Sequence, residues 1–351
     1  MRRPTTIKDI AKEMDVSIAT VSRALSGKPG VSDELREKIQ IKAEELGYLR
    51  NSAAISLKTS KTKTIGVIVS DIRNPFFLDF LTGVDNVLFS RGYKFLLSNS
   101  DESVEKEKIY LNWMVEHGVE GILASPVSEK DGKSNISLYR KFYKLGIPIV
   151  LYDRTFPKET QFDSVTIDNK DSIIQALIYL KNKGHEKIGI FLSKSGIYTI
   201  EERLKGFIEG CKLLNLPFKE EWIGRDLYPE EMTYNKLKEL LDKNNLPTAI
   251  IATNNKITKL LVSASRKLNI NIPKDLSIMG YDDLPENEII SPPITCIKQP
   301  VFEIGRIAST VLLGKINDNF SEPTKVILKA EIIERKSIQD LNKKVSHFIN
   351  T

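Results

Sequence analysis

The stretch VSIATVSRALSG, residues 16–27, carries a single arginine, Arg23, among small hydroxyl and methyl side chains. Ser17 is placed to cap the start of a short helix, because its side-chain oxygen can accept a hydrogen bond from a first-turn amide, and Gly27 is placed to end it. The stretch therefore predicts a helix too short to bury much surface by itself.

The two sides of this helix differ in character. Val21, Ala24 and Leu25 would form one apolar stripe. The other side carries Ile18, Ala19, Ser22 and Arg23. A solvated helix face normally carries Glu and Lys, so small side chains beside one arginine indicate a face that approaches another molecule closely.

Two further helices are expected around this one. Thr6, with Asp9 three positions on, predicts the start of the first, and Asp15 occupies the following turn, where left-handed backbone is often needed. Another helix is expected between Ser32 and Gly47. Their apolar positions at helical spacing are Ile7, Ile10, Ala11 and Met14, then Leu35, Ile39, Ala43 and Leu46. The pattern predicts three short helices that share one small core.

The tight turn between the first two helices predicts a helix-turn-helix, whose second helix enters the DNA major groove. Small side chains would let the backbone approach base edges, and Arg23 could donate two hydrogen bonds to guanine. The alternative is a plain three-helix bundle without DNA binding.

Positive charge is concentrated at the N-terminus. Residues 1–63 carry thirteen Lys or Arg and eight Asp or Glu, net +5, whereas the other 288 residues carry 39 and 38, net +1. A basic segment on a nearly neutral body is typical of a nucleic-acid-binding module, although a solvated basic face would have the same charge.

Three segments carry a resemblance to a known family. TIKDIAKEMDVSIATVSRALSG (6–27), VSDELREKIQIKAEELGY (31–48) and NSAAISLKT (51–59) resemble the N-terminal signature of the lactose-repressor (LacI/GalR) family of bacterial transcription factors, and the resemblance continues to about residue 337. Position 15 departs from the family, which usually has Gly where this chain has Asp.

The resemblance implies a set of DNA-contacting residues. It places Ile18, Ala19 and Arg23 at base edges. Near phosphates it places Thr20, Ser22, Tyr48 and Asn51, and Ser17 completes the set at the start of the helix. It also implies that residues 51–62 form a hinge helix that folds on operator DNA, with Leu57 wedged into the minor groove beside Lys58. The alternative is an ordinary interdomain linker.

From residue 63 onward, short β-branched runs alternate with helical patterns, which predicts parallel α/β sheets. The first set has strands at 64–70, 94–100, 121–126 and 148–153, with helices near 76–91, 103–117 and 135–145. The second has strands at 163–168, 187–193, 248–254, 276–282, 294–299 and 325–332, with helices near 169–183, 199–214, 230–243, 255–269 and 301–314. We expect two doubly wound subdomains around one cleft, an arrangement that resembles the periplasmic sugar-binding fold.

The expected organisation has four parts. A helix-turn-helix head (1–50) and a hinge (51–62) precede a two-subdomain effector-binding and dimerisation core (63–338) and a tail (339–351). The tail is too short for a tetramerising coiled coil, so a homodimer is expected.

Polar and aromatic side chains follow the predicted strands, where parallel sheets bind ligands. Asp71, Arg73 and Asp153 lie there, and the resemblance extends the set to Arg203. The predicted effector-binding residues are Asn74, Phe76, Phe77, Arg154, Arg203, Asn254, Asp282 and Gln299. Carboxylates, amides, guanidinium groups and aromatic rings together suit a sugar, although any one of these residues could instead be a turn or a helix cap.

Two departures from the family leave the identity of the effector open. Asn255 stands where the family often has Asp, and Ser128 stands where related pentose binders place an acid.

Several classes of chemistry lack support in the sequence. Cys211 and Cys296 are 85 positions apart and suggest neither a zinc site nor a disulfide framework, while the three histidines, His117, His185 and His347, are scattered. No P-loop, HExxH or GxSxG motif occurs. We expect no cofactor, no metal and no catalytic residues.

The expected protein is therefore a repressor of carbohydrate genes that binds double-stranded operator DNA and responds to a small sugar-like effector. No apolar run reaches the length of a membrane span and no signal peptide is evident, so a cytoplasmic protein is expected. Three alternatives are a solute receptor, an enzyme acting on a sugar, and a repressor controlled by a corepressor protein.

Overall fold

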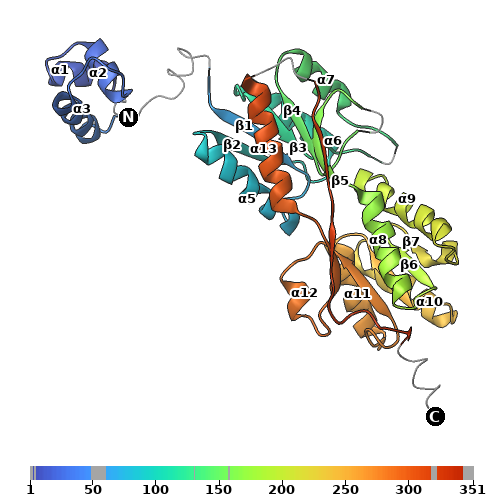
Figure 1. Ribbon diagram of the computed structural model, residues 1–351. Helices are drawn as coiled ribbons and strands as arrows, with labels where there is room; N and C mark the ends of the chain where they lie inside the picture. The colour runs from blue at the N-terminus through green and yellow to red at the C-terminus, as the bar shows by residue number, and fades with distance from the viewer. Residues whose placement is uncertain are drawn as a thin grey trace. The chain divides into compact units, whose positions relative to one another are not determined.

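The computed structural model describes residues 3, 5–48, 61–129, 131–156, 159–317 and 322–342, which fall into two units, residues 1–62 and 63–351. The first unit holds α1 (Ile7–Glu13), α2 (Ile18–Leu25) and α3 (Asp33–Glu45) (Figure 1). These are the three helices that the sequence predicts.

The ends of the first three helices follow from local side chains. The Asp9 carboxylate accepts hydrogen bonds from the Thr6 backbone amide and hydroxyl, both at 2.7 Å, and Ser17 accepts one from the Thr20 amide at 3.0 Å. Asp15 has φ 50°, which confirms the predicted left-handed turn between α1 and α2. Val21, Ala24 and the rest of a small apolar core hold the helices together.

The second unit contains two six-stranded sheets (Figure 1). The strands of the first are β1 (Thr64–Val69), β2 (Lys94–Asn99), β3 (Gly121–Ala124), β4 (Ile149–Tyr152), β5 (Asp163–Ile167) and β11 (Lys325–Leu328). The strands of the second are β6 (Ile188–Phe191), β7 (Ile223–Gly224), β8 (Ala249–Ala252), β9 (Ser277–Tyr281), β10 (Thr295–Lys298) and β12 (Glu331–Ile333).

The orders are β11-β5-β4-β3-β1-β2 and β7-β6-β8-β9-β10-β12. Every pairing is parallel except that of β10 with β12. We call the two sheets with their helices the first and second subdomains.

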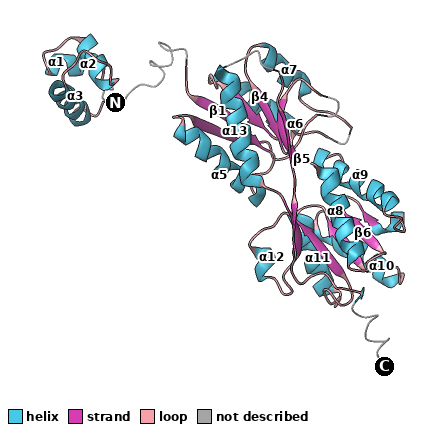
Figure 2. Cartoon of the chain, in the orientation of Figure 1, coloured by secondary structure: helices cyan, strands magenta, loops and turns pink. Residues whose placement is uncertain are grey.

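Helices cover both faces of each sheet (Figure 2). In the first subdomain they are α5 (Pro75–Ser90), α6 (Val104–Glu116), α7 (Ile136–Lys144) and α13 (Val301–Asn317). In the second they are α8 (Asn169–Asn182), α9 (Tyr198–Leu213), α10 (Glu230–Asp242), α11 (Asn255–Lys267) and α12 (Glu286–Ile289), with the 3-10 helix Glu220–Trp222. Because both faces are covered, strands such as β1 are almost continuously apolar and buried.

The packing of α5 on α13 depends on two glycines. A Cβ added at Gly83 would collide with the Phe302 carbonyl oxygen, and one added at Gly305 would collide with the Phe80 carbonyl oxygen. The two backbones therefore approach each other closely at positions where only glycine fits.

Three predicted assignments are wrong. Strand 163–168 was expected in the second set, but β5 pairs with β4 in the first sheet. The helix near 301–314 was expected in the second set, but α13 packs on α5 and on the first sheet. The segment 325–332 was expected as one strand, but β11 joins β5 and β12 joins β10 in the other sheet. Neighbours distant in the sequence decide all three cases, so local patterning could not resolve them. Strand β7 and helix α12 were not predicted.

Candidate functional site

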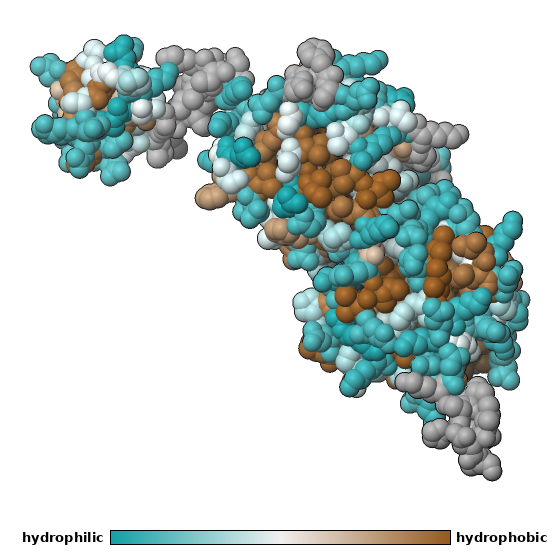
Figure 3. All heavy atoms as spheres, viewed as in Figure 1, coloured by the Kyte–Doolittle hydropathy of each residue, from teal (hydrophilic) through white to brown (hydrophobic). Residues whose placement is uncertain are grey.

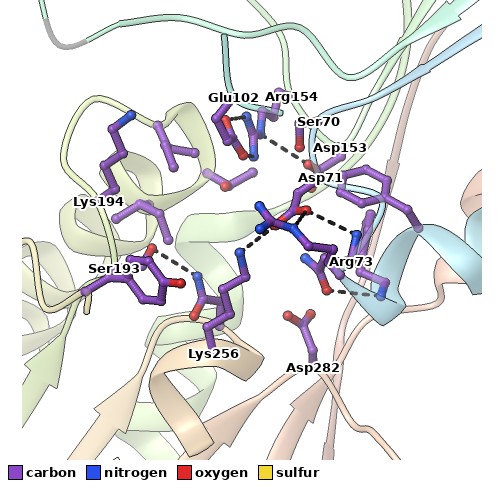
Figure 4. A pocket seen from close by; sticks show the side chains of 18 of the residues that line it. Ser70, Asp71, Arg73, Glu102, Asp153, Arg154, Ser193, Lys194, Lys256 and Asp282 are labelled. Atoms are coloured by element: carbon purple, nitrogen blue, oxygen red, sulfur yellow. Dashed lines mark hydrogen bonds and ion pairs between the residues drawn. The ribbon is translucent and has the colours of Figure 1, made fainter. Parts of the chain in front are cut away.

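A pocket of about 320 Å³ lies at the carboxyl ends of the parallel strands of both subdomains (Figure 4). Its wall includes Asp71 after β1, Arg154 after β4 and Asn254 after β8. In each sheet the strand order reverses beside β1 or β6, the position where open α/β sheets bind ligands.

The structure brings the predicted effector-binding residues together. All eight line this pocket: Asn74, Phe76, Phe77, Arg154, Arg203, Asn254, Asp282 and Gln299. Asp71, Arg73 and Asp153 line it as well. Their contact with a ligand stays a prediction.

Several pocket residues were missed by the sequence analysis. They are Ser70, Asp101, Glu102, Ser193, Lys194, Ile197, Thr199, Ile200, Tyr228 and Lys256. Asp101 and Glu102 follow β2 directly, so the rule that located Asp153 and Asp282 could have found them. Lys256 lies within α11, where no strand-end signal marks it.

Arg154 is held by acidic side chains. Its two terminal nitrogens donate to the Glu102 carboxylate at 2.8 and 2.7 Å, and its Nε lies 3.4 Å from Asp153 Oδ2. Burial would raise the pKa of Glu102, but the charge and hydrogen bonds of Arg154 outweigh it and lower that pKa. Glu102 and Arg154 therefore form a charged pair in the pocket wall.

Arg203 is buried and held on three sides by neutral partners. Its Nε donates to Asn169 Oδ1 at 2.9 Å, its Nη1 donates to the Thr253 carbonyl oxygen at 2.5 Å, and its guanidinium lies 3.6 Å from the centre of the Tyr281 ring. These partners fix the guanidinium in the second subdomain.

Asp282 is buried beside amide donors. It accepts hydrogen bonds from Gln299 Nε2 at 2.6 Å and from the Asn255 backbone amide at 3.3 Å. Burial raises the pKa of Asp282 and also that of Asp153, and the negative charge of Asp282 adds to the shift at Asp153. The pocket therefore contains two buried acceptor groups that would gain from hydroxyl donors.

Four of the acidic pocket residues have left-handed backbone: φ is 52° at Asp101, 56° at Glu102, 61° at Asp153 and 64° at Asp282. Such conformations cost roughly 1–3 kcal/mol each and cluster at functional sites. Their presence here supports a binding role for these strand ends.

Two of the predicted effector-binding residues also cap helices, which is the alternative role that the sequence left open for them. Asn74 accepts from the Phe76 amide at 3.1 Å at the start of α5, and Asn254 accepts from the Ile257 amide at 2.9 Å at the start of α11. Asn255, the departure from the family's Asp, donates to Asn74 Oδ1 at 2.7 Å and so links the subdomains.

Ser128, the other departure, lies outside this pocket. It lines a separate hollow and donates to the Gly196 carbonyl oxygen at 3.3 Å. The position therefore gives no information on the ligand of the main pocket.

Helix α2 presents the side chains that the sequence assigns to DNA. Ile18, Ala19 and Arg23 are exposed, whereas Val21 and Ala24 are buried against α1 and α3. Within residues 5–48 no hydrogen bond or ion pair occupies the Arg23 guanidinium.

The other predicted DNA contacts differ in their surroundings. The Ser17 hydroxyl lies 2.8 Å from the Thr20 hydroxyl, so these two share a cap, while Ser22 and Tyr48 are half-buried. Asn51, Leu57 and Lys58 lie outside the described residues. Their roles stay predictions.

A helix-turn-helix head and a core built like a periplasmic binding protein define a class, the ligand-binding transcriptional regulators. The family profile described as "Bacterial regulatory proteins, lacI family" matches residues 6–51, and the "Periplasmic binding protein-like domain" profile matches residues 177–338. The chain is 30% identical over 337 residues to the HTH-type transcriptional repressor PurR of Photobacterium profundum, covering 96% of this chain and 99% of the relative. The chain belongs to the LacI family and is a DNA-binding transcriptional repressor of that type.

Solved structures share the fold. A LacI family transcriptional regulator from Enterococcus faecalis with bound ribose is 29% identical, with a TM-score of 0.68 over 79% of this chain and 99% of that chain. The lac repressor dimer bound to operator has a TM-score of 0.84 at 20% identity, over 96% of this chain and 100% of that chain.

None of the helices in the described part of the chain is long and apolar enough to cross a membrane. The same part of the chain contains no group of three His, Cys, Asp or Glu side chains that could hold a metal ion.

Proposed function

We propose that this chain is a homodimeric repressor whose operator binding is controlled by a small sugar held between the two core subdomains, with D-ribose as the first candidate. One observation carries the proposal: all eight predicted effector residues, drawn from both subdomains, line a single pocket of about 320 Å³. The related regulator with bound ribose supports the choice of sugar.

The chemistry of the pocket suits a polyol. Asp153 and Asp282 offer buried acceptors, Gln299 and Lys194 offer donors, and the rings of Phe76 and Phe77 offer an apolar wall. A deep small-molecule pocket also favours a sugar over the alternative of a corepressor protein.

The same proposal assigns the head (1–50) to the operator and residues 51–62 to a hinge between head and core. Exposed Ile18, Ala19 and Arg23 support base contacts by α2. Figure 3 shows apolar side chains gathered on the face of the first subdomain that carries α13, which supports a dimer formed there.

Thermal unfolding of the full chain with a panel of sugars tests the proposal. A ligand at 100 times its dissociation constant adds about 2.7 kcal/mol to stability, enough for a clear rise in melting temperature. We expect ribose to raise the melting temperature and to change operator affinity in a gel-shift assay. A panel without any stabilising sugar would contradict the proposal.

A further inference from the structure

We propose that Glu102 determines the charge of the ligand that this pocket accepts, because it neutralises Arg154 and so favours uncharged sugars over phosphorylated ones. This inference rests on the proposed function. It adds a specificity-determining residue that the strand-end pattern had not included.

The Glu102–Arg154 pair is the first observation. Both terminal nitrogens of Arg154 donate to the Glu102 carboxylate, at 2.8 and 2.7 Å. The Arg154 side chain is 10% exposed and that of Glu102 is 27% exposed, so the carboxylate faces the pocket more than the guanidinium does. Bidentate pairing uses the donor geometry with which arginine otherwise binds a phosphate.

The other arginines of the pocket are also occupied. Arg203 is held by Asn169, Thr253 and the Tyr281 ring. Arg73 donates to Asp71 at 2.9 Å and to Asp101 at 3.0 Å. An anionic ligand would therefore compete with two carboxylates at Arg73 and with neutral partners at Arg203.

Lysines complete the cationic set. Lys256 lies 2.6 Å from Asp71 Oδ2. Lys194 is exposed at the edge of the pocket, where its charge acts on Glu102 (Figure 4). Removing the Glu102 charge would leave Arg154 of the first subdomain and Lys194 of the second without the carboxylate on which both charges act.

The two buried acidic residues, Asp153 and Asp282, also disfavour an anionic ligand. Asp282 accepts hydrogen bonds from neutral amide groups rather than from a cation. Asp153 also lies in the pocket wall, and its charged neighbour is Arg154, at 3.4 Å. A phosphate in this space would meet two buried carboxylates, whereas sugar hydroxyls would donate to them. The wild-type pocket therefore disfavours anions and suits uncharged polyols.

Isothermal titration calorimetry of the full chain tests the inference with two probes, D-ribose and D-ribose 5-phosphate. The variant Glu102→Gln removes the charge and keeps an oxygen acceptor for Arg154. Glu102→Asn is the second variant, since Asn tolerates the left-handed backbone at this position. Glu105→Gln is the matched control, because it removes a nearby charge at an exposed position outside the pocket lining, where Glu105 pairs with Lys108.

We expect the control to bind both probes as wild type does, and the two Glu102 variants to gain affinity for ribose 5-phosphate relative to ribose by roughly tenfold or more. Glu102→Asp, which keeps the charge, should continue to discriminate against the phosphate. A purely structural role for Glu102 would lower the affinity for both probes together.

Three outcomes would overturn the inference while leaving a sugar-binding pocket. They are wild type binding ribose 5-phosphate as tightly as ribose, the folded Glu102 variants gaining no affinity for the phosphate relative to ribose, and Glu105→Gln gaining as much as they do. If neither probe binds any of the proteins, the proposed function fails and the inference falls with it.

Discussion

Lys256 Nζ lies 2.6 Å from Asp71 Oδ2 and thereby joins the two subdomains across the pocket (Figure 4). Asp71 follows β1 in the first subdomain, and Lys256 belongs to α11 in the second. The pKa of Asp71 is lowered although burial opposes the shift, because Lys256 and Arg73 both stabilise the charged carboxylate. The pair is therefore in place to stabilise a closed arrangement of the subdomains.

Replacing Lys256 with Met should weaken effector binding, because the closed arrangement would lose a contact between subdomains. Lys256 is 38% exposed, so solvent screening limits the loss to about 0.5–1 kcal/mol, or roughly two- to fivefold in Kd. Calorimetric titration with ribose measures the change. Lys259→Met is the control, since Lys259 pairs with Glu286 inside the second subdomain at 3.2 Å. Equal losses in both variants would contradict the cross-cleft role.

Replacing Asp282 with Asn should abolish most of the effector's influence on DNA binding. Each hydrogen bond from a hydroxyl to this carboxylate is worth about 1.5–3 kcal/mol, so the Kd for the effector should rise by roughly tenfold or more. Asn suits the backbone, which has φ 64° at this position. Operator affinity without effector should stay near that of wild type, as fluorescence anisotropy can measure. A wild-type response to effector would place the binding site elsewhere.

Replacing Arg23 with Ala should cost about 1–3 kcal/mol of affinity for an operator selected from a random duplex pool, because base contacts are lost. Affinity for random DNA should change much less, since only one charge is removed. Lys38→Ala removes the same charge from α3, where Lys38 pairs with Glu34, and serves as the control. Equal losses on selected and random DNA would show that Arg23 contacts the backbone only.

Stability should fall as the pH rises from about 5 to 8 because of a buried carboxyl, Glu107. Its carboxylate accepts hydrogen bonds from the Val127 amide, Asn135 and Tyr139 at 2.9, 2.7 and 2.9 Å. Burial outweighs these bonds and raises the pKa of Glu107 from 4.5 to about 7. Because the pKa is higher in the folded state than in the unfolded state, Glu107 contributes its full stabilisation at a pH below the unfolded pKa. This stabilisation, about 3 kcal/mol, is lost as the pH rises through the folded pKa.

Equilibrium urea unfolding at several pH values measures this loss. The free energy of unfolding of Glu107→Gln should lack that part of the pH dependence, so its difference from wild type should change between pH 5 and 8. Glu105→Gln, at an exposed position on the same helix, should keep the wild-type slope. A Glu107→Gln variant with the wild-type slope would disprove the assignment.

Features that depend on residues close together in the chain follow from the sequence alone. Thr6, Ser17 and Ser32 start the three helices of the head because each lies within three residues of the amides of its own first turn. Asp153 and Asp282 could be predicted as pocket residues because polar residues that end parallel strands meet at one edge of a sheet. This rule needs no knowledge of which other segments pack nearby.

Only the tertiary structure decided which distant segments meet. The pairing of Glu102 with Arg154 spans 52 residues and that of Asp71 with Lys256 spans 185, so no local pattern marks either pair. The same reason explains why 163–168 was assigned to the wrong sheet and why 325–332 divides between two sheets. Strand propensity shows that a segment is extended, but the packing of the whole core selects the sheet edge that completes its hydrogen bonds.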